Sequence, residues 1–173
     1  SGQYANIADF AFQNRQDITG LIIEEGVETI GTGAFERANN IASVQFPSSL
    51  KSIGDNSFYA TALTSVELPE GLEYLSGLRN ISGLTEITIP DSVTTIGSYG
   101  LMDNANLKTI NWGEGITTIG TSALANTGLE ELTIPNSVTQ IGFLAVRKND
   151  QLAQVSFEEG RTSPLSMGEW AFS

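Results

Sequence analysis

Apolar residues recur along this chain in one fixed order, with a period of 21–23 residues. The shared pattern is L-x-x-I-x-I-P-x-x-V-x-x-I-G-x-x-A-F, followed by five or six residues before the next copy. Seven copies begin at Ile18, Ile41, Leu63, Leu84, Leu107, Leu129 and Leu152. Half-copies at 7–12 and 167–172 fit the same pattern. A period of this length is typical of a solenoid, so we interpret residues 1–173 as a single repeat domain.

The first segment of each copy has the alternation of a short strand. In the fourth copy Ile87 and Ile89 fall on one face, while Glu86 and Thr88 fall on the other. Proline follows directly at Pro90, and because proline cannot donate a ladder hydrogen bond, the strand ends there. The pattern therefore predicts one strand of about four residues in each copy.

One such copy cannot bury its own apolar side, but stacked copies bury a continuous core. The predicted fold is an α/β or mainly-β solenoid, a right-handed coil of about seven repeats with parallel strands along one face. A glycine recurs after the second isoleucine, as in Gly54 and Gly120. It indicates either a turn with positive φ or a close approach of the backbones of adjacent coils.

Two copies depart from the pattern. The third has no Ala-Phe pair in register over Leu75–Ile81, so we expect a distorted turn in which Leu78 or Ile81 fills the place of phenylalanine. The last copy has three extra residues, which we expect to bulge near Arg161 to Pro164. No polar capping repeat is evident at the end of the sequence, which predicts either end-to-end self-association through Phe157, Leu165 and Phe172 or a longer native chain.

The repeat closely resembles the BspA-like leucine-rich repeats, also called the TpLRR class. The resemblance is carried by Ile89-Pro90 to Leu101 and Ile134-Pro135 to Val146, and it extends over about residues 7–172. It implies a curved leucine-rich-repeat solenoid with the strand sheet on the concave side and short irregular or helical segments on the convex side. It also implies an extracellular or cell-surface location on a microbial protein and a role in adhesion to host proteins or other cells.

Composition excludes several classes of function. The net charge is −12, and the 8 basic residues are scattered singly, which argues against nucleic acid and against docking on anionic lipid. No apolar run approaches the roughly 18 residues of a membrane span, so direct membrane insertion is not expected. The chain has no Cys and no His, the usual thiolate, general-base and metal-ligand side chains. We therefore predict no catalytic, cofactor-binding or metal-binding residues.

Calcium on the outward carboxylates of the strands is the remaining metal hypothesis, and no D-x-D-x-D-G loop supports it. The same carboxylates have no deep cleft or aromatic platform of the kind that a glycosidase requires. Among the functions considered for this sequence, catalysis is thus the least favoured.

The outward side chains of the strands form the candidate partner-binding surface. On the predicted concave face they are Ser43, Gln45, Ser65, Glu67, Glu86, Thr88, Thr109, Asn111, Glu131 and Thr133. These rows contain no Arg, Trp or Tyr, the residue types that dominate binding hot spots, so the rows themselves favour a plain solvated face over a binding face. Trp112 takes a strand position where other copies have isoleucine, which predicts a packing role.

The favoured function is a non-catalytic protein-recognition or adhesion module, whose partner is a host or microbial surface or matrix protein. The alternative is a structural spacer that presents another domain. The two irregular regions, 75–81 and 160–164, are where we expect features particular to this protein.

Overall fold

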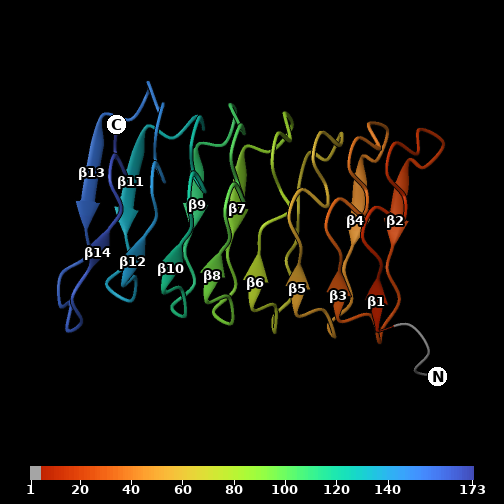
Figure 1. Cartoon of the computed structure of the whole chain (residues 1–173), viewed down its shortest axis with the longest axis horizontal. Coiled ribbons are helices and arrows are strands. Elements are labelled where there is room, and N and C mark those ends of the chain that lie inside the picture. The colour runs from red at the N-terminus through yellow and green to blue at the C-terminus, as the bar shows by residue number, and fades with distance from the viewer. Residues whose placement is uncertain (1–4) are drawn as a thin grey trace.

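The computed structural model describes residues 5–173, and residues 1–4 of the predicted domain lie outside it. It is a solenoid of about seven coils in which every paired strand is parallel, as predicted (Figure 1). The first strand segments are β2 (Gly20–Ile22), β4 (Ser43–Gln45), β7 (Glu86–Thr88), β9 (Thr109–Asn111), β11 (Glu131–Ile134) and β13 (Gln154–Phe157). The second segments are β1 (Asn6–Ile7), β3 (Thr29–Ile30), β5 (Ser52–Ile53), β6 (Tyr74–Leu75), β8 (Thr95–Ile96), β10 (Thr118–Ile119), β12 (Gln140–Ile141) and β14 (Ser166–Met167).

The unbroken sheet lies on the second segments, where the sequence predicted none. All eight second-segment strands pair in the order β1-β3-β5-β6-β8-β10-β12-β14. A glycine follows six of these eight strands and permits the close spacing there, because a Cβ at Gly120 would lie 2.7 Å from the backbone carbon of Gly97. Gly120 has no positive φ, so close approach between coils, and not a left-handed turn, explains this glycine.

The first segments form three separate two-stranded sheets, β2-β4, β7-β9 and β11-β13, instead of one continuous sheet. Residues 64–69 of the third coil contain no strand, which separates β4 from β7. No ladder joins β9 to β11. The predicted strand face is thus present, but it is interrupted in two places.

The third face of the solenoid consists of turns, and residues 5–173 contain no helix, so the helical part of the prediction is wrong for this face. Most of these turns have two residues in the left-handed region four positions apart, such as Gly33 (φ 59°) and Arg37 (φ 56°). Their N–H groups donate to the following coil, for example from Phe35 to the carbonyl of Ser57 at 2.8 Å. On this face the coils are therefore connected by hydrogen bonds between turns, without helices or strands.

Large side chains stack beneath these turns. Phe12, Phe35 and Phe58 form a column with ring centroids 5.2 Å apart at each step. Leu78 continues the column, since its N–H donates to the carbonyl of Gly100 as Phe58 donates to Gly77. Of the two residues expected at the phenylalanine position of the distorted third copy, Leu78 or Ile81, it is Leu78 that lies there.

The extra residues of the last copy lie in the connection between β13 and β14, as expected. Arg161 anchors this connection, because its guanidinium donates to the backbone carbonyls of Pro135, at 2.9 Å, and Val138. The core of the solenoid is one continuous cluster from Ile23 to Ala171.

Candidate binding surface

All ten candidate residues are exposed, and the pairing register puts the eight that lie on strands in the predicted outward rows. Glu86 pairs with Thr109, and Thr88 with Asn111, across the β7-β9 ladder. The remaining strand candidates are Ser43 and Gln45 on β4 and Glu131 and Thr133 on β11. Ser65 and Glu67 lie on the irregular segment of the third coil and belong to no sheet. The structure therefore brings the candidates together in separate groups.

Neighbouring polar side chains within a strand pair bind one another. The Asn111 amide donates to the Glu86 carboxylate at 2.7 Å and to the Thr88 hydroxyl at 3.2 Å. The Thr133 and Ser156 hydroxyls are 2.9 Å apart on β11 and β13. These contacts stabilise the β7-β9 and β11-β13 pairs, whereas the β9/β11 junction is bridged at one end by an ion pair between Lys108 and Glu130.

The junction between β9 and β11 is open. Every Cα–Cα distance between these two strands exceeds 8 Å, whereas adjacent strands in a sheet are about 4.8 Å apart. No backbone hydrogen bond joins residues 108–112 to residues 130–134. The same two coils remain paired on the other face, through β10 and β12. They are therefore splayed, close on one side and separated on the other.

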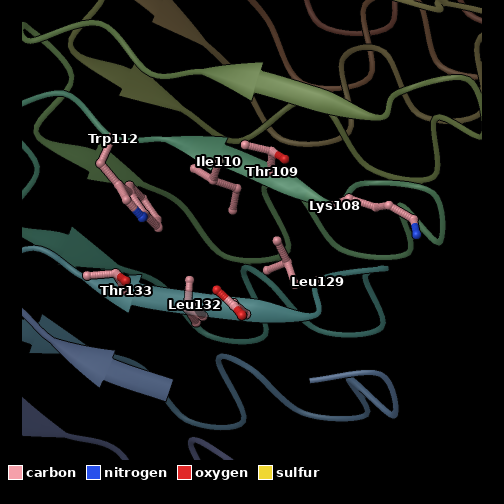
Figure 2. Close-up of a pocket in the computed structure, with 8 residues that line it drawn as sticks. Lys108, Thr109, Ile110, Trp112, Leu129, Leu132 and Thr133 are labelled. Carbon is pink, nitrogen blue, oxygen red and sulfur yellow. The ribbon is translucent and has the colours of Figure 1, made fainter. Parts of the chain in front are cut away.

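Trp112 is the side chain at the opening that departs from the repeat. It occupies the inward position that Ile89 and Ile134 take in the flanking coils, and the larger indole extends into the space between β9 and β11 (Figure 2). Its side chain is half-buried and packs against the core cluster, in line with the predicted packing role. In the sequence, the gap is marked only by the replacement of Ile by Trp at this position. The sequence predicted a packing role for Trp112 and not an opening.

A second inter-coil contact is missing at the same junction. Ser49 and Ser92 occupy one repeat position, and their hydroxyls donate to the preceding coil, at the carbonyls of Val27 (2.9 Å) and Leu72 (2.7 Å). Ser137 occupies that position in the sixth coil, and its hydroxyl has no hydrogen-bond partner among the described residues. The Ser137 hydroxyl therefore adds no hydrogen bond between the sixth coil and the fifth.

Three adjoining hollows follow the open junction. The central one, of about 270 Å³, is lined by Ile110 and Trp112 on one side and Leu129, Leu132 and Thr133 on the other, with Lys108, Thr109 and Glu131 (Figure 2). A second, of about 310 Å³, shares Lys108 and Thr109 and adds Glu130. A third, of about 530 Å³, shares Trp112 and reaches Glu114 and Glu158. We call these three hollows together the β9/β11 groove.

The groove is acidic at both ends. Glu130 and Glu131 line one end, and Glu114 and Glu158 line the other. Lys108 is the one basic lining residue, and its ammonium forms an ion pair of 2.5 Å with Glu130. A side-chain hydrogen bond from Lys108, followed by its charge, lowers the pKa of Glu130. With four carboxyl side chains and one ammonium group, the lining of the groove has an excess of acidic residues.

Arginine and tyrosine, which the strand rows lack, gather on the turn face. The guanidinium of Arg79 lies 5.2 Å from the ring centroid of Tyr59 and 5.9 Å from that of Tyr99. It also pairs with Asp103 at 2.9 Å. The guanidinium of Arg37 lies 5.9 Å from the ring centroid of Tyr59. These side chains satisfy one another, which favours a stabilising role for them.

Neither a metal cluster nor a membrane-spanning helix is found in the described part of the chain. No group of three or more Asp and Glu side chains within residues 5–173 is arranged to bind a metal ion. The same residues include no helix with the length and hydrophobicity that crossing a bilayer requires.

A family model for the BspA-type leucine-rich repeat region matches six copies over residues 5–78 and 76–173. The chain belongs to this family. The resemblance of the repeat motif is therefore confirmed, and the BspA-type repeat accounts for the isoleucine–glycine steps of the eight-stranded sheet.

Solved structures share the fold of this BspA-type chain. A leucine-rich repeat protein of T. pallidum matches with a TM-score of 0.69 and 19% identity, over 94% of this chain and 66% of that one. A leucine-rich repeat protein of Bacteroides ovatus has a TM-score of 0.58 and 19% identity, over 100% and 62%. The pneumococcal vaccine antigen PcpA has a TM-score of 0.54 and 24% identity, over 94% and 50%.

This chain thus spans less than two thirds of each of these three proteins. A comparison with curated proteins finds no match.

Proposed function

We propose that this chain is a non-catalytic protein-recognition module of a secreted or cell-surface microbial protein, and that it binds its partner through the strand face, centred on the β9/β11 groove. The family supports an interaction role, because leucine-rich repeats present an extended surface made from many coils. The description of PcpA as a vaccine antigen supports an extracellular location.

The groove is the observation that carries this proposal. It is the place where the candidate residues Thr109, Glu131 and Thr133 surround a half-buried Trp and several aliphatic side chains. An aromatic anchor in a pocket with a polar rim is typical of binding hot spots. The other candidates, such as Ser43 and Gln45, lie on strands with small polar side chains and extend the surface without such an anchor.

A spacer function is the second candidate. It is favoured by the eight-stranded sheet, which connects all coils on one face without interruption. In that case the strand rows are solvated surface, and a neighbouring domain in a longer protein binds the partner.

Surface plasmon resonance of the chain over a panel of immobilised extracellular-matrix and cell-surface proteins distinguishes the two. We expect at least one panel member to bind, and Glu131→Lys to weaken that binding about tenfold or more. Glu73→Lys is the matched control, because Glu73 is an exposed carboxylate just before β6 on the other face. No binding to any panel member, or an equal loss from both variants, would leave the spacer function as the better explanation.

A further inference from the structure

The β9/β11 groove separates two strands by more than one strand spacing. All Cα–Cα distances between β9 and β11 are above 8 Å, whereas paired strands lie about 4.8 Å apart. Unpaired strand edges bind extended peptides through main-chain hydrogen bonds. Here two such edges face each other, since β9 pairs only with β7 and β11 only with β13. An inserted segment could therefore bind to the backbone on both sides.

The floor of the groove selects apolar side chains. Ile110 and Trp112 on one wall face Leu129 and Leu132 on the other. In an extended segment alternate side chains point the same way, so every second residue of the occupant would face this floor. The occupant should accordingly have aliphatic residues at two positions separated by one.

The rim of the groove selects basic side chains. Glu130 and Glu131 lie at one end and Glu114 and Glu158 at the other, and only Glu130 among them pairs with a lysine. From Lys108 to Trp112 is four residues, or about 13 Å of extended chain. Two outward basic residues four positions apart would therefore each reach one acidic end.

We propose that the β9/β11 groove receives an extended, basic segment of the partner protein, with basic residues at its first and fifth positions and aliphatic residues at its second and fourth. This inference rests on the proposed recognition function and adds to it the chemical class of the partner. The segment enters between the two strand edges, packs its aliphatic side chains on Trp112, and directs its basic side chains to the two acidic ends.

The test uses the whole chain and the peptide Lys-Val-Thr-Val-Lys-amide, with fluorescein attached to its N-terminus through a glycine spacer and binding measured by fluorescence anisotropy. Two control peptides separate the contributions. Glu-Val-Thr-Val-Glu reverses the charge, and Lys-Pro-Thr-Pro-Lys keeps the charge but removes two N–H donors. We expect both controls to bind at least about tenfold more weakly than the first peptide.

Variants of the protein place the peptide in the groove. Trp112→Ile restores the repeat residue and should remove binding by closing the groove, while the fold is retained. Glu131→Gln should weaken binding of the basic peptide several-fold. Glu73→Gln is the matched control, because Glu73 is also an exposed carboxylate but lies just before β6 on the other face. It should leave the affinity unchanged.

The results separate this inference from the recognition function. Equal affinity for all three peptides, or no effect of Trp112→Ile, would overturn the proposed occupant. If the peptide does not bind at roughly 1 mM but panel proteins bind in a manner sensitive to Glu131→Lys, recognition stands and the basic extended segment is rejected. If the peptide binds and no panel protein does, the result supports a basic extended segment as the occupant of the groove, and the panel did not contain the partner.

Discussion

At the scale of single residues, buried amides connect the coils where the repeat pattern is least regular. The side chain of Asn104 is fully buried. Its oxygen accepts the N–H of Ile81 at 2.7 Å, and its nitrogen donates to the carbonyls of Leu78 and Leu101 at 2.8 and 2.9 Å. One side chain thus satisfies three backbone groups around the shortened turn of the third coil.

Replacing this amide should be costly. Asn104→Ala leaves a buried N–H and two buried carbonyls without partners, and we expect a loss of about 2–3 kcal/mol in the free energy of unfolding. Urea denaturation followed by circular dichroism measures the loss. Asn106→Ala is the control, because Asn106 is exposed and makes one bond, to the carbonyl of Ser82. A similar loss in both variants would show that burial of the amide is not the cause.

The carboxylate of Glu25 gives stability a dependence on pH. It accepts the N–H groups of Ser48 and Ser49 and the Ser48 hydroxyl, and the backbone bond from Ser48 is the main cause that lowers the pKa of Glu25 below its ordinary 4.5. Because the pKa is lower in the folded state, the ionised group stabilises the fold above pH 4.5, and this stabilisation is lost as the pH falls through the lowered pKa.

Glu25→Gln should therefore lower the thermal midpoint at pH 7, and the difference from the unmodified chain should shrink at pH 3. The neighbouring exposed Glu24→Gln serves as control, since the Glu24 side chain makes no hydrogen bond within residues 5–173. Equal differences at both pH values would contradict the role assigned to the Glu25 carboxylate.

At the scale of elements, the period of the sequence was sufficient to predict the coils, their number and the outward register of Glu86, Thr88, Thr109 and Asn111. These follow from alternation and spacing, which are local properties of each copy. The position of the unbroken sheet was not predicted, because Thr118-Ile119 is only two residues long and has no strand signal of its own. Its pairing depends on the close approach that Gly120 permits between coils.

The groove could not be predicted from the sequence, for a related reason. A repeat pattern describes each copy, whereas the distance between β9 and β11 depends on how two copies pack. Trp112 was visible as an exception to the isoleucine pattern, but whether a larger side chain is absorbed or pushes coils apart is decided by its neighbours. The sequence was therefore sufficient to predict the outward rows of candidate residues. It was not sufficient to predict that the strands separate between β9 and β11.

Restoring the repeat residue should close the gap. In Trp112→Ile the fifth coil has the same inward residue as its neighbours, and we expect β9 and β11 to form a parallel ladder. Amide hydrogen exchange measures this directly, through increased protection of residues 109–111 and 131–134. Protection in β10 and β12, already paired, should not change. Unchanged exchange at β9 and β11 would show that Trp112 does not hold the coils apart.

At the scale of the whole molecule, the inter-coil hydrogen bonds of the turn face all have the same orientation. They run from the N–H of one coil to the carbonyl of the next, as from Tyr99 to Thr121 and from Ser122 to Phe143. In the last coil the N–H groups of Trp170 and Phe172 make no backbone bond within residues 5–173. The two ends of the solenoid are therefore complementary, with donors at one end and carbonyls at the other.

This polarity predicts how copies of the 173-residue chain self-associate. Phe172 has the repeat position of Phe12, and the two side chains are 38% and 37% exposed, so Phe172 of one copy can stack on Phe12 of the next as Phe12 stacks on Phe35. We expect weak head-to-tail association that increases with salt, because the net charge of −12 repels copies at low ionic strength. Sedimentation velocity over a concentration series in low and high salt measures it.

Phe172→Glu should abolish the association, whereas Phe143→Glu, at an exposed aromatic away from the end, should not. Association that both variants remove equally, or that salt weakens, would contradict stacking through the end coils.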